Sequence, residues 1–180
     1  YFLGQSMHKS PAIIQARISS KRLPGKVLCH LCGKTILQYL IESLEKCSSI
    51  NQIIVITSTD ESDNSIISFC EEYEVETYRG SLENVAERML DTVNYFNLKS
   101  FVRISGDSPL IDYQIIEKAI RVFDNGDYDL VTNTFPRSFP IGQSVEVIRT
   151  STFKKAYNKM SKPDHFEHVT KYYYDHPNKF

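Results

Sequence analysis

Residues 12–26 read AIIQARISSKRLPGK, and this stretch indicates both a fold class and a first candidate site. It opens with a short apolar run that is typical of a strand buried on both faces. A loop with four cations follows, and it contains the chain's one Pro-Gly pair. Proline sets one backbone angle and glycine reaches conformations closed to other residues, so the pair can bend the chain until amides and cations converge on an anion. The stretch therefore predicts a phosphate-binding loop, with a solvated basic loop as the alternative.

The chain continues as an alternation of strand-like and helical segments. Further β-branched runs of strand length occupy residues 53–58, 75–78 and 101–105. Apolar side chains recur at helical spacing within residues 36–44, 66–73, 85–96 and 115–123. Strands joined by helices predict an α/β domain of three layers, α/β/α, with a mainly parallel, twisted sheet. Such sheets bind ligands at the carboxyl ends of their strands, which is where the basic loop lies.

The last third of the sequence is less regular. Residues 128–133 and 144–149 read as two more strands, the second antiparallel, and helices are expected over residues 151–160 and 164–175. The first seven residues, YFLGQSM, resemble the remnant of an expression tag. We therefore expect one domain over residues 8–180.

Composition limits the partners that the chain can have. Its 21 basic and 22 acidic residues give a formal net charge of −1 and are spread along the sequence, which argues against nucleic-acid and membrane-surface binding. No apolar run approaches the roughly 20 residues of a membrane span and no leader opens the chain, so a cytoplasmic location is expected. The four cysteines include a lone C-x-x-C at residues 29–32. Since structural zinc takes four ligands, we expect reduced thiols, with a zinc or redox site as the minor alternative.

A second polar motif, RISGDSPLID at residues 103–112, follows the strand expected at residues 101–105. Asp107 stands between Gly106 and Ser108-Pro109, which predicts a carboxylate on a sharp turn at the same sheet edge as the basic loop. A carboxylate that faces a polyphosphate indicates a hard divalent cation between them. The alternative is that Asp107 only closes the turn or caps the next helix.

Five segments together carry a family resemblance: AIIQAR..SKRLPGKVL, YRGSLENVAER, FVRISGDSPLID, NTFPRSFPIG..VEV and EHVTKYYYDHPNKF. They resemble the spore-coat-polysaccharide type of cytidylyltransferase, which is related to the CMP-KDO and CMP-acylneuraminate synthetases. The most specific pair is A-R-x-x-S-x-R-L-P-G-K with G-D-x-P-L-I. The resemblance implies a glycosyltransferase-A-like fold and transfer of CMP from CTP to a sugar, such as a sialic-acid-like or KDO-like acid, for surface polysaccharide synthesis. Pyrophosphate is released, and Mg²⁺ is the implied cofactor.

Matching positions imply the roles of individual residues. Lys26, Arg17 and Asp107 would form the catalytic set, with Asp107 on Mg²⁺, and small Ala16 would let the base approach the backbone. The implied nucleotide-binding residues are Ala16, Arg17, Ser20, Arg22, Gly25, Lys26, Arg79, Ser81 and Arg88. The implied sugar-binding residues are Asn133, Arg137, Glu146 and His168.

This sequence departs from the family pattern at three places. Ser144 stands where the P-x-G-x-D-x-E-V segment has its aspartate, and Ser19 replaces a small glycine of the loop. The family continues past the position of Phe180 with a segment that supplies an acidic residue to the metal site. We therefore expect the domain to lack that segment.

Other interpretations stay open at this point. A glycosyltransferase of related fold is one, although its metal site is usually written D-x-D, and a nucleotide-binding protein without transfer activity is another. His165 and His168 could bind a metal together with Asp164, but a plain polar helix face is the expectation. The expected partners are CTP and a sugar whose identity the sequence does not name, and a homodimer is left open.

Overall fold

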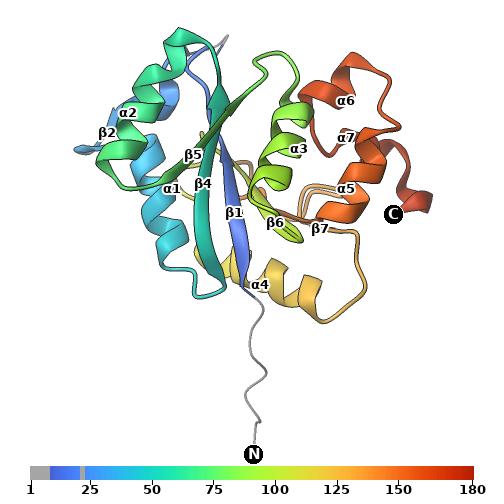
Figure 1. The fold of residues 1–180 in the computed structure, drawn as a ribbon. Helices are drawn as coiled ribbons and strands as arrows, with labels where there is room; N and C mark the ends of the chain where they lie inside the picture. The colour runs from blue at the N-terminus through green and yellow to red at the C-terminus, as the bar shows by residue number, and fades with distance from the viewer. Residues whose placement is uncertain (1–8, 21–22) are drawn as a thin grey trace, which may run out of the picture.

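Six strands form one sheet, in the order β5-β4-β1-β6-β8-β7 (Figure 1). The computed structural model describes residues 9–20 and 23–180. The strands are β1 (Ser10–Gln15), β4 (Ile50–Ser58), β5 (Glu76–Gly80), β6 (Ser100–Ser105), β7 (Leu130–Thr132) and β8 (Glu146–Arg149). β1 pairs in parallel with β4 and with β6, and β4 pairs in parallel with β5. β8 runs antiparallel between β6 and β7, so the expected mainly parallel sheet with one antiparallel strand is confirmed.

Helices follow the strands as the apolar spacing predicts. They are α1 (Ile36–Glu45), α2 (Asn64–Glu72), α3 (Val85–Tyr95), α4 (Tyr113–Asp124), α5 (Thr150–Tyr157), α6 (Pro163–Glu167) and α7 (Lys171–Asp175), with single 3₁₀ turns η1 (Lys26–Leu28), η2 (Glu61–Asp63) and η3 (Pro177–Lys179). Three helices begin at a polar residue whose side chain accepts a hydrogen bond from the first turn: Thr35 for α1, Asn84 for α3 and Asp112 for α4. These caps satisfy amides that have no partner inside the helix.

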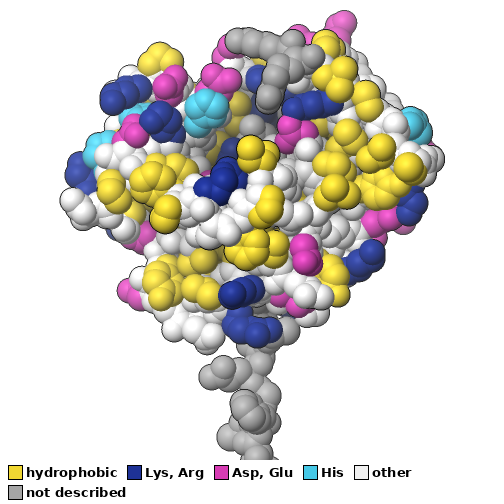
Figure 2. Space-filling view, turned by 180° about the vertical axis from the view of Figure 1, so that it is seen from behind, with side chains coloured by type: hydrophobic (Ala, Val, Ile, Leu, Met, Phe, Trp, Pro, Cys, Tyr) yellow, Lys and Arg dark blue, Asp and Glu magenta, His cyan; other side chains and the backbone are white. Residues whose placement is uncertain are grey.

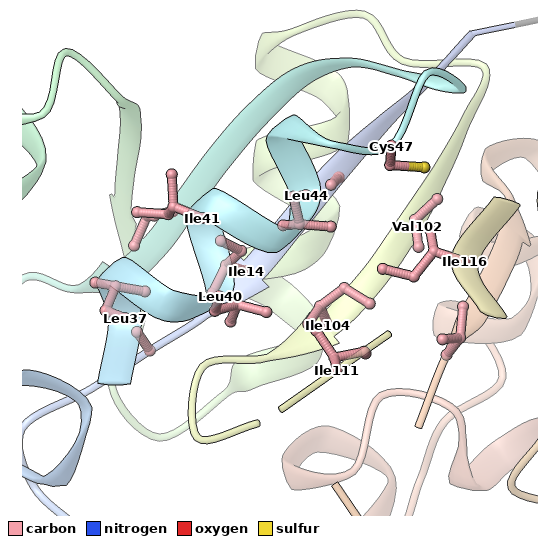
Figure 3. Packing of buried hydrophobic residues seen from close by; sticks show 14 of the residues in the cluster. Ile14, Leu37, Leu40, Ile41, Leu44, Cys47, Val102, Ile104, Ile111 and Ile116 are labelled. Carbon is pink, nitrogen blue, oxygen red and sulfur yellow. The ribbon is translucent and has the colours of Figure 1, made fainter. Parts of the chain in front are cut away.

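The two faces of the sheet support separate apolar layers. Ile14 is fully buried against α1, α2 and α4, as Figure 3 shows for the α1 side, where Leu37, Leu40 and Leu44 cover the strands. Ile13, one residue earlier, points to the opposite face and packs with residues of α3, α5 and α7. Side chains alternate along a strand, so a strand covered on both faces needs an unbroken apolar run, as the sequence of β1 has.

Two features differ from the sequence-based expectations. The helix expected over residues 164–175 is two short helices, because the chain leaves helical geometry at His168, where φ is −109° and ψ is 85°. Val169 and Thr170, in this break, are buried, so tertiary contacts override the local helical pattern. A small hairpin of β2 (His30–Leu31) and β3 (Lys34–Thr35) follows the basic loop and was not expected.

The hairpin also explains the C-x-x-C motif. Cys29 precedes β2 and Cys32 stands in the turn after it, and both are free thiols. Among the described residues, no group of three or more His, Cys, Asp or Glu side chains could hold a metal ion. The described part of the chain also contains no helix that is long and apolar enough to span a membrane.

We predict that Ile14→Ala lowers the free energy of unfolding by about 2–5 kcal/mol, because it leaves a cavity between β1 and the helices on one face. The measurement is urea unfolding at equilibrium. Val122→Ala on α4 is the control, since Val122 is 41% exposed and its truncation should change stability by no more than about 0.5 kcal/mol. Equal stability of the two variants would contradict the packing described here.

Candidate active site

The basic loop leaves the carboxyl end of β1, and hydrogen bonds to a single carbonyl group, that of Ile18, close it. The Ile18 carbonyl accepts hydrogen bonds from the amides of Ser20, at 2.7 Å, and Gly25, at 2.8 Å. Gly25 has φ +71°, a left-handed conformation that favours glycine, and the turn of η1 begins directly after it with Lys26. The loop is therefore closed at its base, with Arg17 before the closure and Lys26 after it.

Asp107 faces this loop from the end of the neighbouring strand. Its carboxylate makes an ion pair and hydrogen bond with the Lys26 ammonium and accepts a second hydrogen bond from the Ser105 hydroxyl at 2.6 Å. Burial acts to raise the pKa of Asp107, but the hydrogen bonds from Lys26 and Ser105 outweigh it, and the pKa lies below its usual range. Asp107 is therefore a carboxylate at neutral pH. It does not cap α4, because Asp112 does so.

Gly106 lets the two strand ends approach closely. Its amide donates to the Gln15 carbonyl at 2.9 Å. A Cβ atom at this position would lie 2.9 Å from that carbonyl oxygen and 3.0 Å from the Ala16 Cβ. Only glycine fits this contact without displacing the backbone that leads into the basic loop.

These elements border a cleft of about 330 Å³ at the carboxyl ends of β1 and β6. This is the switch point of the sheet: β4 and β5 lie on one side of β1, and the later strands, beginning with β6, lie on the other. Figure 2 shows basic and acidic side chains interspersed on the face that it draws, consistent with a local site and not a broad basic surface. The cleft is lined by Gln15, Ala16, Arg17, Ser20, Lys26, Val27, Val85, Arg103, Ser105, Asp107, Glu167 and His168.

The cleft brings together six of the predicted site residues: Ala16, Arg17, Ser20, Lys26, Asp107 and His168. Gly25 shapes the loop from behind it. Arg22 lies outside the described residues.

Three of the predicted nucleotide-binding residues, Arg79, Ser81 and Arg88, do not line the cleft and hydrogen-bond to nearby groups of the protein. Arg79 donates to the carbonyls of Ser58 and Asp60 and to the Asn64 side chain, all at 2.8–2.9 Å. These contacts occupy its guanidinium in tying the end of β4 to the start of α2. Ser81 accepts the Asn84 amide at the start of α3, and its carbonyl accepts a hydrogen bond from Arg88 at 2.5 Å.

Two predicted sugar-side residues lie on the loop between β7 and β8. The Asn133 side chain donates to the Gln143 carbonyl at 2.6 Å and accepts from the Val145 amide at 2.9 Å, so it bridges the two ends of this loop. Arg137 is exposed and donates to the Ser144 hydroxyl at 3.3 Å. Ser144, which replaces the expected aspartate, therefore contacts the arginine of the same loop.

Glu146 is buried and reaches the cleft only through its contact with Arg103, a residue that the motifs do not mark as a site residue. Arg103 lines the cleft, forms an ion pair with Glu146 and donates to the Gln15 amide oxygen at 3.2 Å. Glu146 also accepts hydrogen bonds from Thr170, at 2.7 Å, and from the Tyr174 hydroxyl. The sequence signal for Arg103 was its place between Val102 and Ile104 in an apolar strand, because a charge in a buried strand needs a partner. Glu167 and Ser105, which also line the cleft, had no comparable signal.

The histidines do not form a metal site. His165 is buried, and its Nε2 atom lies 3.1 Å from the Asp175 carboxylate, whereas His168 is exposed at the cleft. The expected plain polar helix face is also wrong for His165, because α6 buries this side chain against Tyr172 and Asp175 of α7. Hydrogen bonds from Lys171 and then His165 lower the pKa of Asp175 to about 2. The His165 contact joins α6 to α7.

The acidic groups at the cleft suit a hard cation that a substrate helps to bind. Mg²⁺ takes oxygen ligands, keeps several waters and is commonly held by one or two carboxylates together with substrate phosphates. Asp107 is an ionised carboxylate opposite the basic loop and meets this requirement. The residues present therefore fit Mg²⁺ as part of a ternary site with a polyphosphate.

Sequence comparison gives the same assignment as the motifs. The chain matches the family model described as Cytidylyltransferase over residues 11–180. It belongs to the cytidylyltransferase family. It is therefore a CTP-dependent nucleotidylyltransferase, and its sheet and helices form the nucleotidyltransferase fold.

Relatives of this cytidylyltransferase come from several organisms. It is 35% identical over 168 residues to an uncharacterized protein of Methanocaldococcus jannaschii, which is 93% of this chain and 68% of that protein. The spore coat polysaccharide biosynthesis protein SpsF of Bacillus subtilis is 30% identical over 172 residues, covering 92% of this chain and 70% of SpsF. A 3-deoxy-manno-octulosonate cytidylyltransferase of Syntrophotalea carbinolica is 30% identical over 109 residues, 61% of this chain and 43% of that protein.

A solved structure agrees over almost the whole fold. The cytidylyltransferase of Leptospira borgpetersenii superposes with a TM-score of 0.90 at 30% identity, over 96% of this chain and 74% of that chain. The elements that border the cleft thus belong to an arrangement that a homologous cytidylyltransferase shares.

We predict that Gly106→Ala weakens CTP binding while the protein stays folded. The added methyl group pushes against the Gln15 carbonyl and Ala16, so the start of the basic loop has to move. Calorimetric titration with CTP should show an affinity about 10-fold lower or worse, since misplacements of about 1 Å have large effects at such sites. Gly126→Ala is the control. Gly126 lies in the turn after α4 and outside the cleft, and an added methyl group there would also meet a neighbouring side chain, that of Tyr128. An affinity equal to the wild type would show that the contact at Gly106 does not position the loop.

Proposed function

We propose that this cytidylyltransferase transfers CMP from CTP to a hydroxyl group of a sugar acid, and that the product serves surface polysaccharide synthesis. The observation that carries the proposal is the cleft in which the basic loop after β1 faces the Asp107 carboxylate after β6. The similarity to SpsF and to 3-deoxy-manno-octulosonate cytidylyltransferase supports the class of acceptor.

The proposed reaction is a substitution at the α-phosphorus of CTP. A bond forms between the acceptor oxygen and the α-phosphorus, the bond from the α-phosphorus to the bridging oxygen breaks, and the hydroxyl proton is released. Negative charge moves onto the departing pyrophosphate. The work of the protein is to align the two reactants and to stabilise that charge.

Lys26 and Arg17 are the side chains placed for the triphosphate. Both line the cleft, and Arg17 adds a forked set of donors that suits phosphate oxygens. Lys26 pairs with Asp107 in the structure, so a bound phosphate has to take the place of that carboxylate. Asp107, released from Lys26, is then available to hold Mg²⁺. Bound Mg²⁺ would supply charge stabilisation and orientation at the α-phosphate.

The base and the acceptor are proposed to bind at opposite sides of these groups. Ala16 offers the base a backbone edge without a bulky side chain, as its buried position at the end of β1 allows. On the other side, Arg103 and His168 line the cleft, and Glu146 holds Arg103 from below. Asn133 and Arg137 would act on the acceptor through the loop that they belong to.

The test is pyrophosphate release with CTP and Mg²⁺ across a panel of sugar acids and neutral sugars. Release that requires a sugar acid supports the proposal, and release with UTP at the same rate would contradict the proposed reading of the base. Release that depends on a neutral sugar would replace the acceptor class. Transfer of a sugar to an acceptor without pyrophosphate release would indicate a glycosyltransferase, and CTP binding without any turnover would indicate a nucleotide-binding protein.

We predict that Lys26→Ala lowers the affinity for CTP by about 10- to 100-fold, the range expected for losing one hydrogen bond to a charged group. The fold should be unaffected, because a partly exposed ion pair contributes little to stability. Calorimetry gives the affinity and thermal unfolding gives the stability. Lys34→Ala is the matched control, since Lys34 also forms an ion pair, with Glu42 at 2.7 Å, but lies outside the cleft. Equal CTP affinities of the two variants would remove Lys26 from the nucleotide site.

We predict that Asp107→Asn reduces the rate of CMP transfer by about 100-fold or more, because an amide is a weak ligand for Mg²⁺ and the metal loses its position. CTP binding without metal should be preserved, since the substitution removes a negative charge next to the phosphates. Single-turnover transfer and metal-free calorimetry separate the two effects. Asp127→Asn is the control, because Asp127 is a fully exposed carboxylate paired with Arg149 outside the cleft. A rate like that of the wild type would exclude Asp107 as the metal ligand.

A further inference from the structure

A fully buried carboxylate, Asp63, lies beneath the basic loop and outside the cleft. It ends the single turn of η2 between β4 and α2, and none of its surface reaches solvent. A buried carboxylate is stable only when its oxygens are hydrogen-bonded. One oxygen of Asp63 accepts the Ile18 amide at 2.7 Å, and the other accepts the Ser58 amide at 3.0 Å and the Ser58 hydroxyl at 2.5 Å.

Asp63 occupies a helix-capping position without capping the helix. It is the residue directly before α2, where an aspartate ordinarily accepts a hydrogen bond from the first helical turn. Its side chain makes no such bond. Asp60, three residues earlier, does cap its own turn by accepting the Ser62 amide at 2.9 Å. The Asp63 carboxylate is thus turned away from its local role toward a residue 45 positions earlier in the chain.

The residue that Asp63 holds is the closing point of the basic loop. Ile18 donates its amide to Asp63, and its carbonyl accepts the amides of Ser20 and Gly25. One carboxylate oxygen therefore fixes the peptide plane between Arg17 and Ile18. The Arg17 side chain and the return of the loop to Lys26 both depend on the orientation of this segment.

Asp63 also balances the charge of Arg88. The Arg88 side chain is fully buried on α3, and two of its guanidinium nitrogens have no hydrogen-bond partner among the described residues. Burial lowers the pKa of Arg88 to about 10, Asp63 acts to raise it, and the positive charge of Arg17 lowers it. Asp63 therefore contributes negative charge that favours the charged form of Arg88.

We infer that Asp63 is a positioning residue for the phosphate loop, acting through the Ile18 amide and touching neither substrate. The inference rests on the proposed function only in taking the loop as the triphosphate site. The arrangement of the loop itself can be measured without nucleotide. The Ile18 amide has Asp63 as its acceptor, so slow hydrogen exchange at Ile18, Ser20 and Gly25 is expected in the nucleotide-free wild-type protein.

The decisive variant is Asp63→Asn, which keeps the shape of the side chain. One end of an amide is a donor, so asparagine cannot accept the Ile18 and Ser58 amides at the same time. Exchange at Ile18, Ser20 and Gly25 should accelerate, and CTP affinity should fall about 10- to 100-fold, the range for loss of one hydrogen bond to a charged group. The KM of the acceptor should change by less than about 2-fold, because Asp63 positions the loop for CTP. This change is far smaller than the one that losing a hydrogen bond to a charged group would cause.

Two control variants separate positioning from general stability. Ser58→Ala removes the hydroxyl on the other carboxylate oxygen and keeps the bond to Ile18, so it should lower the melting temperature with little loss of CTP affinity. Asp60→Asn removes a neighbouring exposed carboxylate and should leave the loop amides and CTP affinity unchanged.

The experiments on Asp63 can fail independently of the proposed function. Failure of the wild-type protein to bind CTP would overturn the function, while the exchange of the loop amides would still test Asp63. Fast exchange of Ile18 in the wild-type protein would overturn the inference, even if Asp63→Asn did not fold. So would unchanged exchange in Asp63→Asn, or a loss of CTP affinity in Ser58→Ala equal to that in Asp63→Asn.

Discussion

The parallel pairing of β1 with β6 is the constraint on which the candidate active site depends. Its register sets Ile13 opposite Arg103 and Gln15 opposite Ser105, so both strands end at the same level. Gly106 then donates to the Gln15 carbonyl and keeps the two strand ends in direct contact. Because of this contact, the loop that follows one strand and the turn that follows the other face each other across a narrow cleft. A bulkier residue at position 106 would separate the two halves of the site.

Within the cleft, each of the three described cations that line it has a carboxylate beside it. Lys26 pairs with Asp107, Arg103 pairs with Glu146, and Arg17 lies 4.0 Å from Glu167. Unpaired cations held close together would repel one another and lose solvation. The carboxylates beside the cations reduce that repulsion, and they show how a chain with a net charge of −1 can hold three cations at one cleft. In the proposed function, a bound polyphosphate competes with these carboxylates for the cations.

Arg103, Glu167 and His168 form one wall of the cleft, and buried polar contacts hold Arg103 in this wall. Thr170 and Tyr174, in the segment after α6, donate to Glu146, which in turn holds Arg103 at the cleft. Burial raises the pKa of Tyr174, and the charge of Glu146 raises it further, so its hydroxyl remains a donor to that carboxylate. The break at His168 lies between Glu167, which lines the cleft, and Thr170, which contacts Glu146.

The main alternation of strands and helices, the basic loop, the turn at Asp107 and the family could all be predicted from the sequence, whereas the β2–β3 hairpin and the break between α6 and α7 could not. The predictable features rest on local patterns: apolar periodicity, a Pro-Gly bend and short motifs whose residues lie close together in the chain. The burial of Glu146 and Arg88, the place of Arg103 at the cleft and the contact of Asp63 with Ile18 could be seen only in the folded structure. Each of these depends on a partner more than 20 positions away or on which face of an element meets another. A charged residue reads alike in a sequence whether it contacts a ligand or holds the residue that does, because the difference lies in burial and in distant hydrogen-bond partners.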